Sequence, residues 1–364
     1  MKVDWVALTA FRSYQSLEWR PDPGVNLLLG PNGAGKTNLL EAISYLSSLR
    51  SFRSVPDAAL ISVDAETSVV RAGVSSGDRE RLIEVEIPRS GPRRTQVDKT
   101  RLQRTADLLG VLRVIAFLPE DLDLVKRGPA LRRDLLDLVA VQLWPAAYLD
   151  QSEFDRALRQ RNAFLKAGDR DDATLSVWDA RLAQSGGRVM ARRVRVMESL
   201  APLLEESYAE IARSDEKASV GYMASWGSGQ VAEKSAAEFT VVLLEALEAS
   251  RRADYERRLT SVGPHRDEPV FRIDQAEARS HGSQGEQRTM ALALKLAAHR
   301  AVADMVGEPP VLLLDDVFSE LDPDRAGALA KALPPGTQTL ITSARPEDVP
   351  VEGSVWQVAE GVHR

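Results

Sequence analysis

The chain has 364 residues, of which 44% are hydrophobic and 27% charged, with a formal net charge of −6 and no cysteine. This length allows two or three domains with a sizeable core, and the composition is that of an ordinary globular protein. The lack of cysteine excludes disulfides and thiolate metal sites and fits a cytoplasmic protein, while the acidic balance argues against a broadly basic nucleic-acid binder but allows a local basic face.

Residues 1–120 are predicted to be rich in strands. The chain opens on a strand-like pattern instead of a signal peptide, and no apolar run approaches the length of a membrane span, so no membrane association is expected. The turn of a hairpin is expected at residues 75–78, and Pro119 ends the last apolar run. The expected strands are residues 3–8, 25–29, 68–74, 82–87 and 111–118.

A glycine-rich loop follows the second of these strands and precedes a helical pattern at residues 38–46. It reads Gly30-Pro31-Asn32-Gly33-Ala34-Gly35-Lys36-Thr37 and fits the P-loop pattern G-x-x-x-x-G-K-[ST]. The glycines let backbone N–H groups surround phosphates, and the positive end of the following helix points at them. Lys36 is expected to contact the β- and γ-phosphates of ATP, and the Thr37 hydroxyl to bind Mg²⁺.

Residues 121–260 show helical periodicity and are expected to form a helical insertion that splits one α/β domain. A stripe of apolar residues crosses a weak spot at Gly186 and Gly187, and ordinary core packing explains it better than a cofactor site. Acidic residues interleave with many of the arginines, and most of these arginines are expected to lie on solvated faces with i,i+4 pairs. These arginines are residues 132, 133, 156, 159, 161, 188, 192, 193, 195, 251, 252, 257 and 258.

Residues 261–364 return to an α/β pattern, with a long helix at 286–306 and strands at 311–314 and 338–342. Asp315 and Asp316 directly follow the strand expected at 311–314. They therefore lie at the carboxyl edge of the sheet, where parallel α/β sheets bind ligands. Asp315 is placed to hold Mg²⁺, directly or through water, and Asp316 to orient or deprotonate the attacking water. Two solvated aspartates after a buried strand would explain the same pattern, but the P-loop favours the functional interpretation.

A second phosphate-binding device is predicted at the start of the long helix. Ser283 and Gly285 would offer a hydroxyl and free N–H groups at the helix N-terminus. One nucleotide does not need two such devices from one chain. The second device is therefore expected to serve a nucleotide held by another subunit.

The order of these motifs resembles that of the ABC-type ATPase heads of the chromosome-maintenance and recombination group, and most closely the RecF family. Ser283 and Gly285 match the signature motif of these heads, and Ser319-Glu-Leu-Asp322 matches their D-loop. The resemblance runs from end to end of the chain and implies an α/β head with an inserted, mostly helical second lobe and no long coiled coil. It also implies that Arg12, in the segment Phe11-Arg-Ser-Tyr14, contacts the nucleotide.

The sequence departs from most ABC ATPases in three places. Asp316 stands where a glutamate is usual, and the shorter carboxylate suggests slow hydrolysis. Thr342 stands at the place of the switch histidine, where a hydroxyl could hydrogen-bond the γ-phosphate but could not accept a proton as imidazole would. The Q-loop glutamine has no clear counterpart, and Glu120 or Asp121 is the candidate replacement.

The resemblance implies an ATP-dependent DNA-binding protein of recombinational repair and replication-fork maintenance, located at the nucleoid. Such proteins bind single-stranded and gapped duplex DNA, act with RecR and RecO to load RecA, and form ATP-dependent homodimers. Lys36, Asp316 and Ser283 would carry a slow hydrolysis that releases DNA, and Arg50, Arg53 and the arginines of the helical lobe are candidate DNA contacts. The alternatives are the ATPase subunit of an ABC-type membrane transporter and a P-loop kinase. The first should carry a Walker B glutamate and a switch histidine, and the second has no use for the Ser283 helix.

Overall fold

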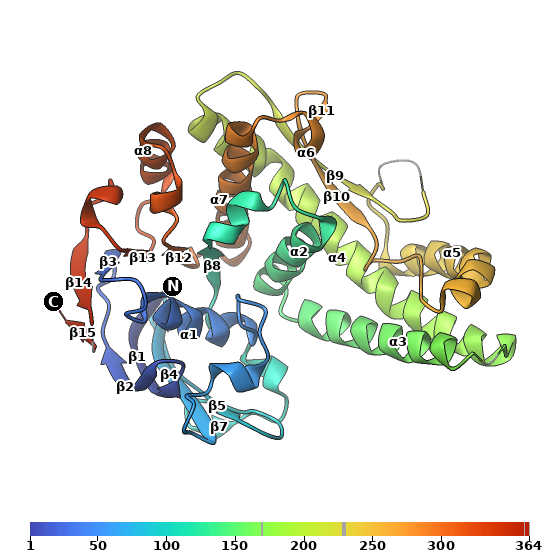
Figure 1. Cartoon of the computed structure of the whole chain (residues 1–364), viewed down its shortest axis with the longest axis horizontal. Coiled ribbons are helices and arrows are strands. Elements are labelled where there is room, and N and C mark those ends of the chain that lie inside the picture. The colour runs from blue at the N-terminus through green and yellow to red at the C-terminus, as the bar shows by residue number, and fades with distance from the viewer. Residues whose placement is uncertain (169, 228–230, 360, 364) are drawn as a thin grey trace. The chain divides into compact units, whose positions relative to one another are not determined.

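The computed structural model describes residues 1–168, 170–227, 231–359 and 361–363, and the chain divides into two compact units (Figure 1). The first unit comprises Met1–Asp123, Glu206–Asp215 and Arg288–Arg364, and the second comprises Leu124–Glu205 and Glu216–Gln287. Residues 261–287 thus lie in the second unit, although the predicted division placed them with the ATPase head. The assignment of 1–120, 121–260 and 261–364 to functional lobes stays a prediction.

A mostly parallel six-stranded sheet in the first unit has the strand order β15-β14-β3-β13-β12-β8. Every residue of β12 and β13 is buried, which explains the continuous apolar run at residues 311–314 of β12. The predictions of strands at 25–29, 311–314 and 338–342 are confirmed. The strands are β3 (Val25–Leu29), β8 (Val114–Phe117), β12 (Val311–Asp315), β13 (Thr339–Ser343), β14 (Ser354–Val358) and β15 (Val362–His363).

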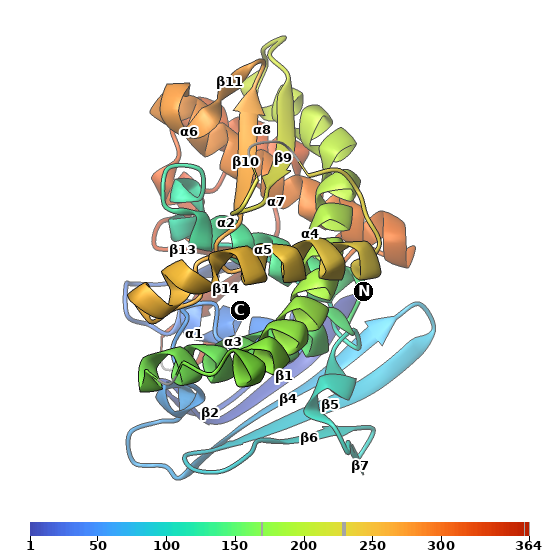
Figure 2. The ribbon, with the colours of Figure 1, turned by 90° about the vertical axis from the view of Figure 1, so that its right-hand side faces the viewer.

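An antiparallel six-stranded sheet in the same unit has the order β2-β1-β4-β5-β6-β7 and fills the lower part of Figure 2. The predicted hairpin is confirmed, because β4 and β5 pair from Thr67↔Pro88 to Ser76↔Arg79. The strands are β1 (Lys2–Phe11), β2 (Tyr14–Trp19), β4 (Thr67–Ser76), β5 (Arg79–Pro88), β6 (Arg94–Val97) and β7 (Thr100–Arg101).

Helix α1 (Lys36–Ser48) connects the two sheets, since it contacts β8, β12 and β13 of one and β1 and β4 of the other. Its first two residues are the last two of the P-loop, so the loop is anchored to both layers of the unit. Two other helices of this unit are α8 (Pro323–Ala332) and the greater part of α7 (Gln284–Val306). Short 3-10 helices span Asp57–Leu60, Thr105–Leu108, Pro119–Asp123, Phe318–Glu320 and Pro346–Asp348.

The second unit combines helices with a three-stranded sheet of order β11-β10-β9. Its helices are α2 (Pro129–Leu143), α3 (Ala147–Ala167), α5 (Ala236–Arg257), α6 (Ala278–His281) and most of α4 (Asp172–Ala212). Its strands are β9 (Ala218–Met223), β10 (Glu268–Ile273) and β11 (Ala276–Glu277). Strand β9 is an exception within a stretch that the sequence predicts to be mostly helical. Six residues without strict alternation become a strand because β10 pairs with them along their whole length.

The weak spot predicted in α4 is a site of close packing, and the helix runs through it without a break. A Cβ atom at Gly186 would lie 2.5 Å from Leu243 Cδ2, and one at Gly187 would lie 2.6 Å from the Ala236 carbonyl oxygen. Both neighbours belong to α5. The two glycines therefore let the helices approach backbone to backbone, and the helix tolerates them because this packing stabilises it.

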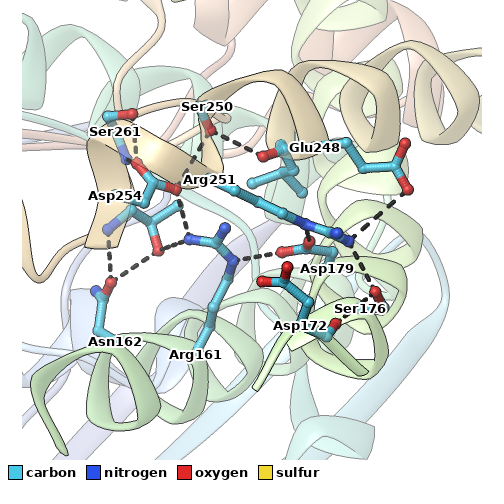
Figure 3. Close-up of polar contacts among 12 residues, drawn as sticks. Arg161, Asn162, Asp172, Ser176, Asp179, Glu248, Ser250, Arg251, Asp254 and Ser261 are labelled. Atoms are coloured by element: carbon cyan, nitrogen blue, oxygen red, sulfur yellow. Dashed lines mark hydrogen bonds and ion pairs between the residues drawn. The ribbon is translucent and has the colours of Figure 1, made fainter. Parts of the chain in front are cut away.

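Several arginines of the second unit are buried, and these are exceptions to the expectation that most of them lie on solvated faces with i,i+4 pairs. Figure 3 shows Arg161 of α3 between Asp179 of α4 and Asp254 of α5, and all three side chains are fully buried. Arg161 donates to Asp179 at 2.7 Å and to Asp254 at 2.8 Å. Arg132 and Arg193 are buried in the same way and pair with carboxylates distant in sequence. A buried charge needs an ion-pair partner, and here the partners lie on other helices and strands. These arginines therefore hold separate elements of the second unit together.

Among the described residues, no helix is both long enough and apolar enough to cross a membrane.

Candidate nucleotide-binding site

The P-loop lies between β3 and α1, which is the strand–loop–helix arrangement that the sequence predicts. Gly33 and Gly35 adopt φ values of +84° and +103°, a backbone region that L side chains rarely occupy. Gly30 is required for a different reason, because a Cβ there would lie 2.2 Å from the Val358 carbonyl oxygen. The loop conformation therefore depends on glycine at three places.

Lys36 is the first residue of α1 and is nearly buried, with 7% of its surface exposed. Its ammonium group donates to the carbonyl oxygens of Gly30 at 2.6 Å and Pro31 at 3.0 Å. Burial lowers the pKa of Lys36, while the charges of Asp316 and Asp315 oppose that effect. The loop thus curls around a cation that lies within the electrostatic reach of both aspartates.

Thr37 and Asp315, the two predicted Mg²⁺ ligands, lie side by side. The Thr37 hydroxyl donates to Asp315 Oδ1 at 2.9 Å, and the Thr342 hydroxyl donates to the same oxygen at 2.8 Å. Burial raises the pKa of Asp315, and the hydrogen bonds from Thr342 and Thr37 counteract this shift. A hydroxyl and a carboxylate are hard oxygen donors of the kind that Mg²⁺ prefers, so the residues present fit this ion.

Asp316 occupies an unusual backbone position at the end of β12. Its φ is +50°, and its N–H donates to the Thr342 hydroxyl oxygen at 2.9 Å. Within the described part of the chain, the buried Oδ1 atom of Asp316 has no hydrogen-bond partner. A fixed carboxylate with an unused acceptor is the arrangement that orienting or deprotonating a water requires.

Thr342 contacts the two aspartates, whereas the sequence suggested a hydrogen bond from its hydroxyl to the γ-phosphate. Its hydroxyl hydrogen is directed to Asp315, and its oxygen accepts from the Asp316 N–H. The hydroxyl therefore positions both aspartates, and in this structure its hydrogen is not available to a γ-phosphate. The pairing of β12 with β13, with Asp315 opposite Thr342, produces this contact.

Arg12 lies beside the P-loop helix but is engaged by a carboxylate that the sequence analysis did not single out. Its guanidinium donates to both oxygens of Glu41 at 2.8 Å, and Glu41 is fully buried. Arg53 also approaches Glu41, at 3.8 Å, and donates to Asn38 Oδ1 at 3.1 Å. Glu41 is an acidic residue among the buried positions of α1, and this feature of the sequence could have indicated that it pairs with an arginine. The predicted contact of Arg12 with a nucleotide, and of Arg53 with DNA, stay predictions.

Ser283 and Gly285 belong to the second unit, and the Ser283 side chain is already used. The Glu286 N–H donates to the Ser283 hydroxyl oxygen at 3.3 Å, and the Ser283 N–H donates to Glu286 Oε2 at 2.6 Å. This reciprocal capping box corrects the expectation of a free Ser283 N–H group. The signal was present in the sequence as Ser283-x-x-Glu286. The hydrogen bonds with Ser283 hold the pKa of Glu286 below its usual range.

The two candidates for the Q-loop position differ in their surroundings. Asp121 pairs with Lys295 at 2.7 Å and accepts from the Leu118 N–H at 2.8 Å. Glu120 is exposed. Asp121 is thereby held within the first unit, whereas the Glu120 side chain extends into solvent.

Comparisons with known proteins agree along the whole chain. The family model described as "RecF/RecN/SMC N terminal domain" matches residues 2–360. A Streptomyces avermitilis protein named "DNA replication and repair protein RecF" is 38% identical over 99% of both chains, and a protein of the same name from Acidothermus cellulolyticus is 39% identical over 96% of both.

Solved structures give the same result for the fold. "The recombination mediator protein RecF-ATPrS in RecFOR pathway" superposes with a TM-score of 0.90 at 33% identity, covering 100% of this chain and 97% of the other. The ATP form of that mediator has a TM-score of 0.85 at 34% identity, covering 99% and 98%. An SMC head bound to a domain of ScpA has a TM-score of 0.58 at 15% identity over 100% and 96%, a likeness of fold alone. The predicted fold class is confirmed, and no long coiled coil occurs in the described residues.

Proposed function

This chain belongs to the RecF family of DNA replication and repair proteins, and we propose that it is an ATP-dependent DNA-binding switch. The observation that carries the proposal is the convergence of Lys36, Thr37, Asp315 and Asp316 at the ends of β12 and the P-loop. A transporter subunit, the alternative considered from the sequence, is set aside because full-length relatives are named as DNA repair proteins. A P-loop kinase is set aside for the same reason.

The P-loop of the first unit is the proposed ATP site. Lys36 draws the β- and γ-phosphates into the loop, because a phosphate competes for its ammonium group with the carbonyls of Gly30 and Pro31. Thr37 and Asp315 would hold Mg²⁺, which neutralises phosphate charge when bound. The backbone of residues 30–37 surrounds the remaining phosphate oxygens.

Asp316 is the proposed base for hydrolysis. Thr342 fixes it through the backbone, and the unused Oδ1 atom is the acceptor for a water proton. A carboxylate one methylene shorter than glutamate lies farther from the γ-phosphate, so slow turnover is proposed. Slow hydrolysis suits a switch, because the ATP-bound form then persists long enough to hold DNA.

We expect Asp316→Asn to bind ATP with an affinity within about twofold of the parent but to hydrolyse it at least about 100-fold more slowly. The substitution removes the base and keeps the shape and the backbone contact to Thr342. Single-turnover hydrolysis measured beside calorimetric ATP binding separates the two effects. The matched control is Asp315→Asn, which should weaken Mg²⁺-dependent binding as well as turnover. Hydrolysis by Asp316→Asn at the parent rate would contradict the assigned role.

Two chains are proposed to close around two ATP molecules, with Ser283 and Gly285 of each completing the site of the other. A two-fold interface of this kind is self-complementary. DNA, single-stranded or as a gapped duplex, would bind across the dimer, with RecR, RecO and RecA acting at the same lesion in the nucleoid. The pathway named for the solved relatives, RecFOR, supports RecO and RecR as partners.

The test is DNA binding with and without ATP. At a formal charge of −6, binding must rest on a local basic face, so we expect affinity for gapped DNA to rise at least about tenfold with ATP and to fall steeply with added salt. Fluorescence anisotropy on gapped and blunt duplexes, at several salt concentrations, measures both. Lys36→Met is the control that should abolish the ATP effect. Equal affinity with and without ATP at physiological salt would refute the switch.

A further inference from the structure

Tyr14 presents a buried hydroxyl to the P-loop without using it. Tyr14 is the first residue of β2, and only 5% of its surface is exposed. Among the described residues, none forms a hydrogen bond with its hydroxyl oxygen. Buried hydroxyls nearly always have a partner, so this one requires an explanation.

The hydroxyl lies directly against Gly35, the residue that precedes α1. A Cβ atom placed on Gly35 would be 2.7 Å from the Tyr14 hydroxyl oxygen and 2.9 Å from the ring carbon that carries it. Gly35 also has the left-handed φ of +103°. The phenol thus occupies the space that any side chain at this loop position would need, and its polar end meets the loop at the helix N-terminus.

Tyr14 is held firmly in this position. The turn that precedes it contains Arg12, which has a left-handed φ of +52° and is bound by both oxygens of Glu41. Asn38 of α1 donates to the Ser13 hydroxyl at 2.8 Å. The two residues before Tyr14 are therefore fastened to the P-loop helix, which fixes the chain where it enters β2.

The unpaired hydroxyl makes the free form of the loop less stable than it could be. Burial raises the pKa of Tyr14 to about 12, so the group stays a neutral hydrogen-bond donor at physiological pH. The loop in front of it is arranged around Lys36, whose ammonium group is bound to the carbonyls of Gly30 and Pro31. A phosphate competes with these carbonyls for the ammonium group, so nucleotide binding changes the contacts that hold the loop.

We propose that Tyr14 is a positioning residue for nucleotide binding, whose hydroxyl gains a hydrogen-bond acceptor only when the P-loop closes around a nucleoside triphosphate. The inference rests on the proposed ATP site. According to this inference, the Tyr14 hydroxyl contributes to the difference in free energy between the nucleotide-free and nucleotide-bound forms. A tyrosine with a purely structural role would stabilise both forms equally. The unpaired hydroxyl destabilises only the nucleotide-free protein, because it gains a hydrogen bond when the nucleotide binds. This gain in free energy increases the affinity for nucleotide.

The experiment is Tyr14→Phe, which removes the hydroxyl and keeps the ring. Without nucleotide, we expect this variant to melt at the same temperature as the parent or higher, because no hydrogen bond is lost. With ATP, we expect about tenfold weaker binding by calorimetry and a smaller rise in melting temperature than the parent shows. Lower stability without nucleotide, or unchanged ATP affinity, would overturn the inference.

The matched control is Tyr45→Phe, on the P-loop helix α1. Tyr45 is fully buried, but its hydroxyl is used, because Arg93 donates to it at 3.0 Å. We expect this variant to melt at a lower temperature and to bind ATP as the parent does. If the parent fails to bind ATP better than Lys36→Met does, the proposed function fails. If the parent binds and Tyr14→Phe binds equally well, only the role of Tyr14 fails.

Discussion

Lys36→Ala is expected to weaken ATP binding at least about 100-fold, which corresponds to about 3 kcal/mol. The ammonium group lies against the P-loop carbonyls and within the electrostatic reach of Asp315 and Asp316. Its removal deletes charge-assisted hydrogen bonds to phosphate, each of which contributes about 1.5–3 kcal/mol. Isothermal titration calorimetry with Mg²⁺ and ATP measures the loss.

The structure adds a complication to this variant, because Lys36 is nearly buried and binds two loop carbonyls. Alanine therefore also removes contacts of the free loop. Lys36→Met keeps the length and packing of the aliphatic stem but removes the ammonium group with its charge and its N–H donors. It should therefore lose ATP affinity to the same extent with less effect on melting temperature. Unchanged affinity in both variants would show that the P-loop is not the nucleotide site.

Ser283→Arg is expected to abolish ATP-driven dimerisation and hydrolysis while leaving ATP binding by the single chain nearly unchanged. A bulky cation would stand where a small hydroxyl must approach the γ-phosphate held by the other subunit's P-loop. Light scattering with and without ATP measures dimerisation, and calorimetry measures binding. ATP-dependent dimers of Ser283→Arg would remove the support for a site shared between two chains.

The capping box at Ser283 makes a control necessary. Replacing this serine also removes a helix cap, which costs about 1 kcal/mol of stability. Ser235 heads α5 with the same reciprocal contact to Glu238, and it lies outside the signature motif. Ser235→Arg should therefore lose similar stability and still form ATP-dependent dimers. Equal loss of dimers in both variants would attribute the effect to helix capping.

Mixing Ser283→Arg with Lys36→Ala provides the sharper test. In their heterodimer, one site combines the intact P-loop of the first chain with the intact signature serine of the second, and the other site is doubly damaged. Some hydrolysis should return, up to about half of the parent activity per dimer when every dimer is mixed. A mixture that forms heterodimers and stays inactive would contradict the shared site.

The sequence was sufficient for the features that depend on local chemistry. The P-loop at residues 30–37 was predictable because its glycines, lysine and threonine occupy adjacent positions whose backbone geometry is set by short-range sterics. Strand β12 and its two aspartates were predictable for the same reason, since a buried parallel strand needs an unbroken apolar run. The resemblance to the RecF family rested on such local segments, and family membership followed from them.

Only the tertiary structure decided which side chains meet. Arg161 and Arg252 look alike in sequence, yet Arg161 is buried between aspartates of two other helices, whereas Arg252 lies on the surface with an i,i+4 partner. Glu41 binding to Arg12, Thr342 binding to Asp315, and strand β9 all depend on segments far apart in the chain. Periodicity records whether a residue faces inward, but the partner it meets there is set by how the elements pack, which no local pattern encodes.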